Sequence, residues 1–204
     1  MSAAAAFIRE NLRLMPVPGL AGVSLYTAHS GSRLSRLGGD APPFWAYPWG
    51  GGLALARYVR EHPECVSGRS VLDLGAGSGL VGIVAALAGA EVCAAEIDPF
   101  GQAAVALNAE ANDVEIALRQ IDIGGAVPAG VELVLAGDVF YDADIAARML
   151  PFLERCRAAG MEVLIGDPGR RDLPVARLRQ VAEFVVGDVG EAGRVGRVYV
   201  LRED

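Results

Sequence analysis

From residue 70 to residue 167 the chain alternates short apolar runs of strand length with longer segments of helical pattern. Strands are predicted at SVLDL, EVCAAE, EIALRQ, VELVLA and MEVLIGD, and helices at GLVGIVAALAG, PFGQAAVALNAEAN and DIAARMLPFLERCRAAG. This alternation is typical of βαβ units, which need a parallel sheet, right-handed crossovers and helices on both faces. Pro99 suits the first turn of its helix, whereas Pro151 predicts a kink or break.

The two ends of the chain are less regular. Residues 3–14 predict a first helix with apolar contacts from Phe7, Ile8, Leu12 and Leu14, VSLYTA a short strand, and LALARYVREH a helix that ends before Pro63. Near the C-terminus, PVARLRQVA predicts a short helix, and EFVVGDV and RVGRVYVLRE predict two strands joined by a GEAG hairpin. This hairpin adds an antiparallel strand to the sheet. We expect one domain over residues 1–204, with N-terminal helices and an aromatic segment over 1–62 and a ligand-binding core over 63–204.

The charge and cysteine content limit the partners and the compartment. A formal net charge of −7 over 204 residues argues against nucleic acid, which needs a basic face, and is compatible with a basic protein. The three cysteines lie far apart without a CxxC pair, so we expect no disulfide framework and no metal site. The longest apolar stretch, LVGIVAALAGA, is too short to span a bilayer, and the N-terminus does not resemble a signal peptide. We therefore expect a cytoplasmic protein.

The glycine-rich sequence VLDLGAGSG, Val71 to Gly79, follows the first strand of the alternating region. Its glycines let the backbone turn tightly and approach a ligand closely. Gly77 to Gly82 reads GxGxxG with Glu96 about 20 residues on, which favours a dinucleotide. Asp73 favours S-adenosylmethionine (SAM) instead, because a carboxylate there would repel a pyrophosphate but could hold the amino end of a methionine moiety. A tight turn without a ligand is the third interpretation.

At this loop the chain resembles the seven-strand, class I SAM-dependent methyltransferases. The resemblance implies a Rossmann-like α/β fold, SAM as cofactor, S-adenosylhomocysteine as product and no metal. It implies that Glu96 binds the ribose and that Asp122 with Ile123 lines the adenine edge. The full set of cofactor-binding residues that we expect is Trp49, Asp73, Gly75, Ala76, Gly77, Glu96, Ile97, Asp122, Ile123 and Gly137. Asp98 is better explained as the cap of the helix that begins near Pro99.

The sequence GDVFYD, Gly137 to Asp142, is an uncommon end for a buried strand, since turns are mostly built from Gly, Pro, Asn, Asp and Ser. Phe140 and Tyr141 are neighbours, so they cannot both face the core of a regular strand. At least one of them should line a cleft. Gly137 would let the cofactor lie close, and Asp142 is expected to cap the following helix, together with Asp144.

Three segments narrow the resemblance. They are the aromatic segment PFWAYPWGGG (Pro43 to Gly52), the Asp-x-Phe-Tyr motif that begins at Asp138, and IGDPGR (Ile165 to Arg170). Together they resemble the protein lysine methyltransferases, and among these the electron transfer flavoprotein β-subunit lysine methyltransferases, although here a proline precedes Trp49 rather than follows it. The resemblance implies that Asp138 captures a lysine amine, that Tyr141 and Phe140 wall its approach, and that the substrate is the electron transfer flavoprotein β-subunit. We expect a monomer.

Other functions fit parts of the same pattern. A small-molecule N-methyltransferase could use the same fold, because a fold does not determine a substrate. An NAD-dependent oxidoreductase would use the GxGxxG register, but Asp73, the aromatic segment and the final hairpin argue against it. A SAM-fold binding module without activity is disfavoured by the Asp138-x-Phe-Tyr motif. Asp167 and Arg170 could form only a turn with an ion pair, or could take part directly in the site.

Overall fold

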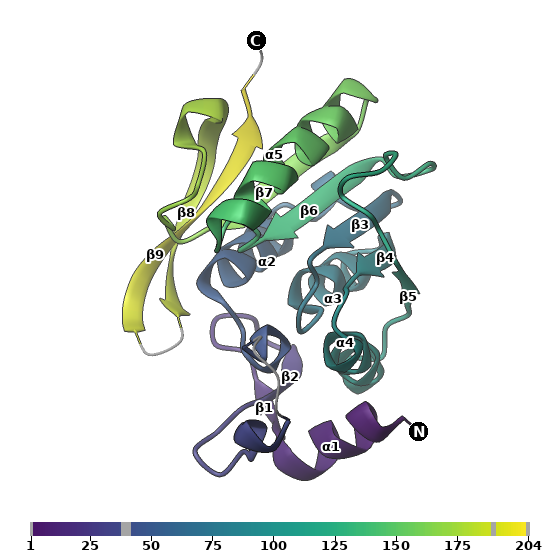
Figure 1. Ribbon diagram of the computed structural model, residues 1–204, viewed down its shortest axis with the longest axis vertical. Helices are drawn as coiled ribbons and strands as arrows, with labels where there is room; N and C mark the ends of the chain where they lie inside the picture. The colour runs from purple at the N-terminus through teal and green to yellow at the C-terminus, as the bar shows by residue number, and fades with distance from the viewer. Residues whose placement is uncertain (1, 38–41, 189–190, 203–204) are drawn as a thin grey trace.

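A computed structural model describes residues 2–37, 42–188 and 191–202, and its main element is a seven-stranded sheet (Figure 1). The strand order is β5-β4-β3-β6-β7-β9-β8, in which the first five strands are parallel and β9 is antiparallel to both neighbours. The predicted Rossmann-like sheet with an antiparallel C-terminal hairpin is therefore confirmed. The strands are β3 (Ser70–Leu74), β4 (Glu91–Ala95), β5 (Ile116–Arg119), β6 (Leu133–Gly137), β7 (Glu162–Asp167), β8 (Leu178–Asp188) and β9 (Glu191–Leu201).

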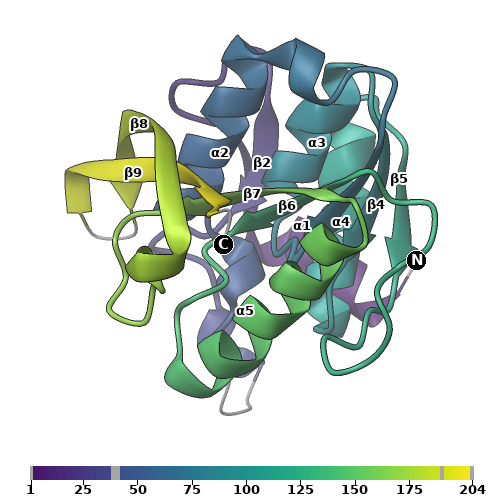
Figure 2. The ribbon, with the colours of Figure 1, turned by 90° about the horizontal axis from the view of Figure 1, so that it is seen from above.

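Helices cover both faces of the sheet (Figure 2). The helices α2 (Gly50–Glu61) and α3 (Leu80–Leu87) pack on one face, where they share a core with Leu133 and Leu135 of β6. The helix α5 (Ala143–Ala158) packs on the other face, against the intervening residues of β6. α5 continues through Pro151, so a break at this residue does not occur: the proline is exposed, and buried residues on both sides of it, Met149 and Phe152, pack the helix against the sheet.

The N-terminal segment lies beside α4 (Pro99–Ala111) and consists of α1 (Ala3–Asn11) and a two-stranded antiparallel sheet of β1 (Arg13–Pro16) and β2 (Ser24–Thr27) (Figure 1). α1 is shorter than predicted, so Leu14 lies on β1 and is 46% exposed instead of packing with the buried Ile8 and Leu12. Asn108 of α4 is fully buried. Its amide oxygen accepts a 2.7 Å hydrogen bond from the backbone of Tyr26, and its amide nitrogen donates to the carbonyl of Ser78. This residue ties the N-terminal segment to the glycine-rich loop.

The predicted helix over PVARLRQVA is only a 3-10 turn, Val175–Arg177, and β8 begins at Leu178. The prediction fails because Leu178 is buried and pairs with Leu201 of β9, so that pairing in the hairpin outweighs local helix propensity. The GEAG turn lies partly outside the described residues. A further 3-10 turn, Phe44–Ala46, interrupts the aromatic segment, and α2 begins at Gly50, three residues before the predicted start.

Candidate active site

The carboxyl ends of β3, β4 and β6 border a cavity of about 460 Å³. The chain order reverses between β3 and β6, and this is where parallel α/β sheets bind ligands. Every predicted site residue except Phe140 lines the cavity: Trp49, Asp73, Gly75, Ala76, Gly77, Glu96, Ile97, Asp122, Ile123, Gly137, Asp138 and Tyr141. Residues far apart in sequence thus meet in one pocket.

Phe140 does not wall this cavity. It is 0% exposed and packs in the core formed by α5 and the sheet. The backbone explains the difference, because Asp138 adopts a left-handed φ of 58°, which ends the strand and breaks its regular alternation. Tyr141 faces the cavity instead, and the ring of Phe44, whose centroid is 4.9 Å from that of Tyr141, supplies the second aromatic wall. Sequence analysis missed Phe44, although it lies in the aromatic segment.

The glycine-rich loop has the tight geometry that the sequence predicts. Gly75, Gly77 and Gly79 have φ values of 69°, 54° and 79°, which side chains rarely tolerate. A Cβ on Gly75 would lie 3.3 Å from the side chain of Val139. The loop therefore exposes its backbone to the cavity, and α3 begins immediately after it.

Asp73 is almost completely buried beside the cavity, with 2% exposure. Its Oδ2 accepts a 2.9 Å hydrogen bond from the backbone N–H of Gly82, and a Cβ on Gly82 would lie only 2.9 Å from the same oxygen. Burial raises the pKa of Asp73 to about 7, against the effect of that hydrogen bond. Gly82, the last glycine of the GxGxxG pattern, is therefore explained by Asp73: its N–H donates to the carboxylate, and a side chain at this position would collide with it. A buried anion at this position suits a cationic amino group.

Glu96, which follows the end of β4, is hydrogen-bonded to the glycine-rich loop. Its Oε2 accepts a hydrogen bond from Gly77 N–H at 2.8 Å and its Oε1 one from Asp98 N–H at 2.9 Å. Each carboxylate oxygen keeps a second lone pair for a ribose hydroxyl. Ile97 beside it is 83% exposed at the rim, where a bound nucleoside could cover it. Asp98 accepts from Phe100 N–H at 2.8 Å, which confirms its predicted role as the cap of α4.

The opposite end of the cavity is apolar. Asp122 is exposed, and its Oδ1 accepts a 2.8 Å hydrogen bond from the backbone N–H two residues on, while Ile123 is half-buried beside it. Ile145 and Met149 of α5 complete this wall, which sequence analysis did not identify. Their four-residue spacing places them on one helical face, and this signal was available in the sequence. Asp142 caps α5 as predicted, and Asp144 lies in its first turn.

The N-terminus of α2 lies directly on the ends of β6 and β7. A Cβ on Gly51 would overlap the carbonyl oxygen of Gly166, and one on Gly166 would overlap the carbonyl oxygen of Gly51. A Cβ on Gly137 would lie 3.0 Å from the Cα of Gly52. Gly137 lines the cavity, but the immediate reason for a glycine at that position is the passage of α2.

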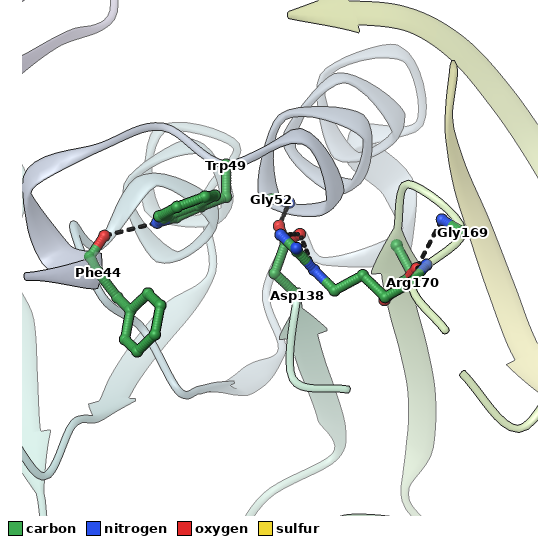
Figure 3. A network of polar contacts seen from close by, with 7 residues as sticks. Phe44, Trp49, Gly52, Asp138, Gly169 and Arg170 are labelled. Atoms are coloured by element: carbon green, nitrogen blue, oxygen red, sulfur yellow. Dashed lines mark hydrogen bonds and ion pairs between the residues drawn. The ribbon is translucent and has the colours of Figure 1, made fainter. Parts of the chain in front are cut away.

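This close contact brings Asp138 to the first turn of α2 (Figure 3). Its Oδ2 accepts a 2.7 Å hydrogen bond from Gly52 N–H, and its Oδ1 accepts two from the guanidinium of Arg170, at 3.1 Å from Nε and 2.5 Å from Nη2. Asp138 is only 9% exposed. Burial raises its pKa to about 6, while Arg170 and the Gly52 N–H oppose the shift, so the carboxylate is mostly ionised at neutral pH.

Trp49 and Arg170 form the side of the cavity next to Asp138 (Figure 3). The indole N–H of Trp49 donates to the carbonyl oxygen of Phe44 at 2.7 Å, and the guanidinium carbon of Arg170 lies 5.5 Å from the centre of the Trp49 ring. Asp167, at the end of β7, accepts from the backbone N–H groups of Gly169 and Arg170, each at 2.7 Å. The IGDPGR segment therefore forms a turn that places Arg170 in the wall of the cavity.

The strand order, the glycine-rich loop and the acidic strand ends together are those of the seven-strand fold of SAM-dependent methyltransferases. A solved structure with the same fold is magnesium protoporphyrin IX methyltransferase from Synechocystis PCC 6803 with bound SAM. It has a TM-score of 0.55, 15% identity, and coverage of 73% of this chain and 76% of that chain. A sequence model of a protein family described as lysine methyltransferase matches residues 46–179, and the chain belongs to this family.

Two relatives are electron transfer flavoprotein beta subunit lysine methyltransferases. The chain is 41% identical over 153 residues to the protein of Danio rerio and 40% identical over 151 residues to that of Rattus norvegicus. The alignments cover 72% and 71% of this chain, and 59% of the length of each relative. Within the part of the chain that the structure describes, no helix is long and apolar enough to cross a membrane.

Proposed function

We propose that this protein transfers a methyl group from SAM to lysine side chains of the electron transfer flavoprotein β-subunit. One observation carries the proposal: a single cavity joins residues suited to the cofactor, Asp73 and Glu96, with residues suited to an amine, Asp138 and Tyr141. Membership of the lysine methyltransferase family supports lysine as the acceptor. The names of the two relatives support the particular substrate.

The residues present fit SAM. Asp73 would hold its ammonium group, Glu96 its ribose hydroxyls, and the apolar wall near Ile123 its adenine. When bound, SAM would supply a methyl group on a sulfonium: the lysine ammonium first loses a proton to water, the lone pair of the neutral amine then forms the new N–C bond, and the electrons of the C–S bond stay on sulfur. The walls of the cavity hold the amine in line and exclude water, and positioning of this kind lowers a barrier by about 7 kcal/mol or more in favourable cases.

Tyr141 is the side chain best placed to orient the amine. Partial burial, together with the negative charges of Glu96 and Asp142, raises the pKa of its hydroxyl, so the phenol stays protonated at neutral pH. The hydroxyl can accept a hydrogen bond from an amine N–H. The rings of Tyr141 and Phe44 give a methylated ammonium product an aromatic surface, which attracts cations by about 0.5–2 kcal/mol.

We place the protein in the cytoplasm and infer a protein, rather than a nucleic acid, as its partner. Two observations support this. The cysteines Cys65, Cys93 and Cys156 are free thiols, as a reducing compartment requires. The net charge of −7 favours a basic protein surface and opposes a polyanion.

Incubation of the purified protein with SAM labelled in its methyl group and with purified electron transfer flavoprotein tests the proposal. We expect label on lysines of the β-subunit, identified by mass spectrometry.

Asp138→Ala should abolish transfer while SAM affinity, measured by calorimetry, stays within several-fold. Because Asp138 also accepts from Gly52 N–H, Asp138→Asn is the matched variant that keeps an acceptor for the helix and removes the charge.

Three outcomes would contradict the proposal. An unlabelled β-subunit with the wild-type protein excludes this substrate. If a cell lysate replaces the purified substrate and label appears only on a small molecule, the acceptor is not a protein. Turnover near the wild-type value in both Asp138 variants would show that Asp138 has no role at the amine.

A further inference from the structure

The carboxylate that faces the amine site already has a cationic partner. Asp138 Oδ1 is bound by two nitrogens of Arg170, and Oδ2 by the first turn of α2. An uncompensated carboxylate would hold an incoming lysine as ammonium, because an opposite charge favours the charged form. An ammonium has no lone pair and cannot accept a methyl group. The nucleophile therefore needs a site where the charge of Asp138 is balanced by something other than the lysine itself.

We propose that Arg170 is a positioning residue that fixes Asp138 and balances its charge, so that the cleft takes up the substrate lysine as a neutral amine. The proposal rests on the proposed function. Arg170 need not touch the reacting atoms: it acts through Asp138, and the proton that the lysine loses on binding goes to water.

Three anchors from different elements hold Arg170 in place. Its backbone N–H donates to Asp167 at the end of β7, its guanidinium pairs with Asp138 at the end of β6, and its guanidinium carbon lies 5.5 Å from the centre of the Trp49 ring in the aromatic segment (Figure 3). Its side chain is only 20% exposed. An arginine held at three points is a fixed part of the site, and a lysine that enters would have to break both contacts of the guanidinium, to Asp138 and to Trp49, to replace it.

Among the described residues, Arg170 is the positively charged side chain that pairs directly with Asp138. β7 contributes Asp167, whose negative charge raises the pKa of Asp138 and is itself offset by Arg170 and Arg194. α2 contributes backbone N–H groups at its positive end, and the β6–α5 connection contributes the neutral phenol of Tyr141. Across the cavity lie Asp73 and Glu96, which the cofactor would engage.

The first test needs no substrate. The carboxyl pKa of Asp138 is measured by 13C NMR titration in the wild type, in Arg170→Gln and in Arg171→Gln. Arg171 is the matched control, because it is adjacent but its side chain is 88% exposed and pairs only loosely with Asp172, at 3.5 Å. We expect the pKa of Asp138, about 6 in the wild type, to rise in Arg170→Gln and to stay constant in Arg171→Gln. An unchanged pKa in Arg170→Gln overturns the proposal.

The second test follows the proton of the substrate. Binding of the β-subunit to the protein loaded with S-adenosylhomocysteine is measured by calorimetry at pH 7 in buffers of different ionisation enthalpy, which counts the protons released. We expect the wild type to release close to one proton per bound lysine and Arg170→Gln clearly fewer. In turnover, Arg170→Gln should lower kcat about tenfold at pH 7 without raising KM, because a rise of about two units in the pKa of the bound amine would leave only about one bound lysine in ten as the neutral amine.

The pH dependence separates this role from a structural one. The loss in kcat should shrink to within about twofold at pH 9.5, and Arg170→Lys, which keeps the charge, should restore most of the activity at pH 7. A loss of equal size at both pH values, or equal proton release by the two proteins, contradicts the proposal. If the wild type does not methylate the β-subunit, the proposed function fails, whereas the titration of Asp138 still decides the role of Arg170.

Discussion

Replacement of Asp73 by asparagine tests whether burial of the ionised carboxylate lowers the free energy of unfolding. Asp73 is 2% exposed, and burial raises its pKa from 3.8 to about 7. Between these values the folded protein binds the proton more tightly than the unfolded chain, so the free energy of unfolding falls as pH rises from about 4 to about 7 and is constant above. A shift of about three pKa units corresponds to a loss of about 4 kcal/mol across this window.

Asparagine keeps an oxygen that can accept from Gly82 N–H but does not titrate. We therefore expect the free energy of unfolding of Asp73→Asn, relative to the wild type, to rise by about 4 kcal/mol between pH 4 and pH 8. Urea denaturation at half-unit pH intervals measures this difference. Asp138, whose pKa is about 6, titrates in both proteins and cancels in the comparison. A difference that does not vary with pH would refute the reasoning.

The same variant separates stability from ligand binding. S-adenosylhomocysteine carries the amino group that Asp73 is proposed to hold, and it should bind the wild type more tightly as Asp73 ionises between pH 6 and pH 8. In Asp73→Asn, calorimetry should find weaker binding at pH 8 and little change in affinity across that range. Equal affinity of the two proteins at pH 8 would exclude Asp73 from the amino-group site.

Four further substitutions test particular contacts. Gly51→Ala should lower the free energy of unfolding by about 1–3 kcal/mol, because its Cβ overlaps the carbonyl of Gly166, whereas Gly52→Ala, with 3.8 Å to its nearest neighbour, should be neutral or stabilising in urea denaturation. Glu96→Ala should weaken SAM binding in calorimetry as its primary defect, and unchanged affinity would exclude the ribose role. Tyr141→Phe should lower kcat with SAM affinity unchanged, and an unaltered kcat would remove the hydroxyl from the mechanism.

The central strands of the sheet, β3 and β6, could be predicted because they are buried on both faces. SVLDL and VELVLA are buried runs with clear limits, and β3 and β6 lie within one or two residues of them. β1 has no such signal, since all four of its residues are exposed. It is held by pairing with β2, and that pairing depends on a partner strand rather than on local periodicity.

The site could be predicted where local chemistry determines it. Closely spaced glycines, which predict left-handed turns, and carboxylates at strand ends can be recognised in a sequence. Asp73 and Glu96 lie at the cavity as expected. The orientation of Phe140 depends on a single backbone angle at Asp138, which the residue types do not fix. The pairing of Arg170 with Asp138 joins residues 32 positions apart that follow the ends of the neighbouring strands β7 and β6, so it requires the strand order before it can be inferred.

The glycine contacts between α2 and the strand ends have a consequence for protein engineering. Backbone lies on backbone at Gly51 and Gly166, and the nearest atom to a Cβ on either glycine is the carbonyl oxygen of the other, so that resizing a neighbouring side chain would not relieve the overlap. The aromatic segment and the sheet are therefore not interchangeable modules. A chimera that takes residues 43–61 from another methyltransferase would have to take the matching positions of β6 and β7 with it, and directed evolution of acceptor preference is better confined to positions outside this joint.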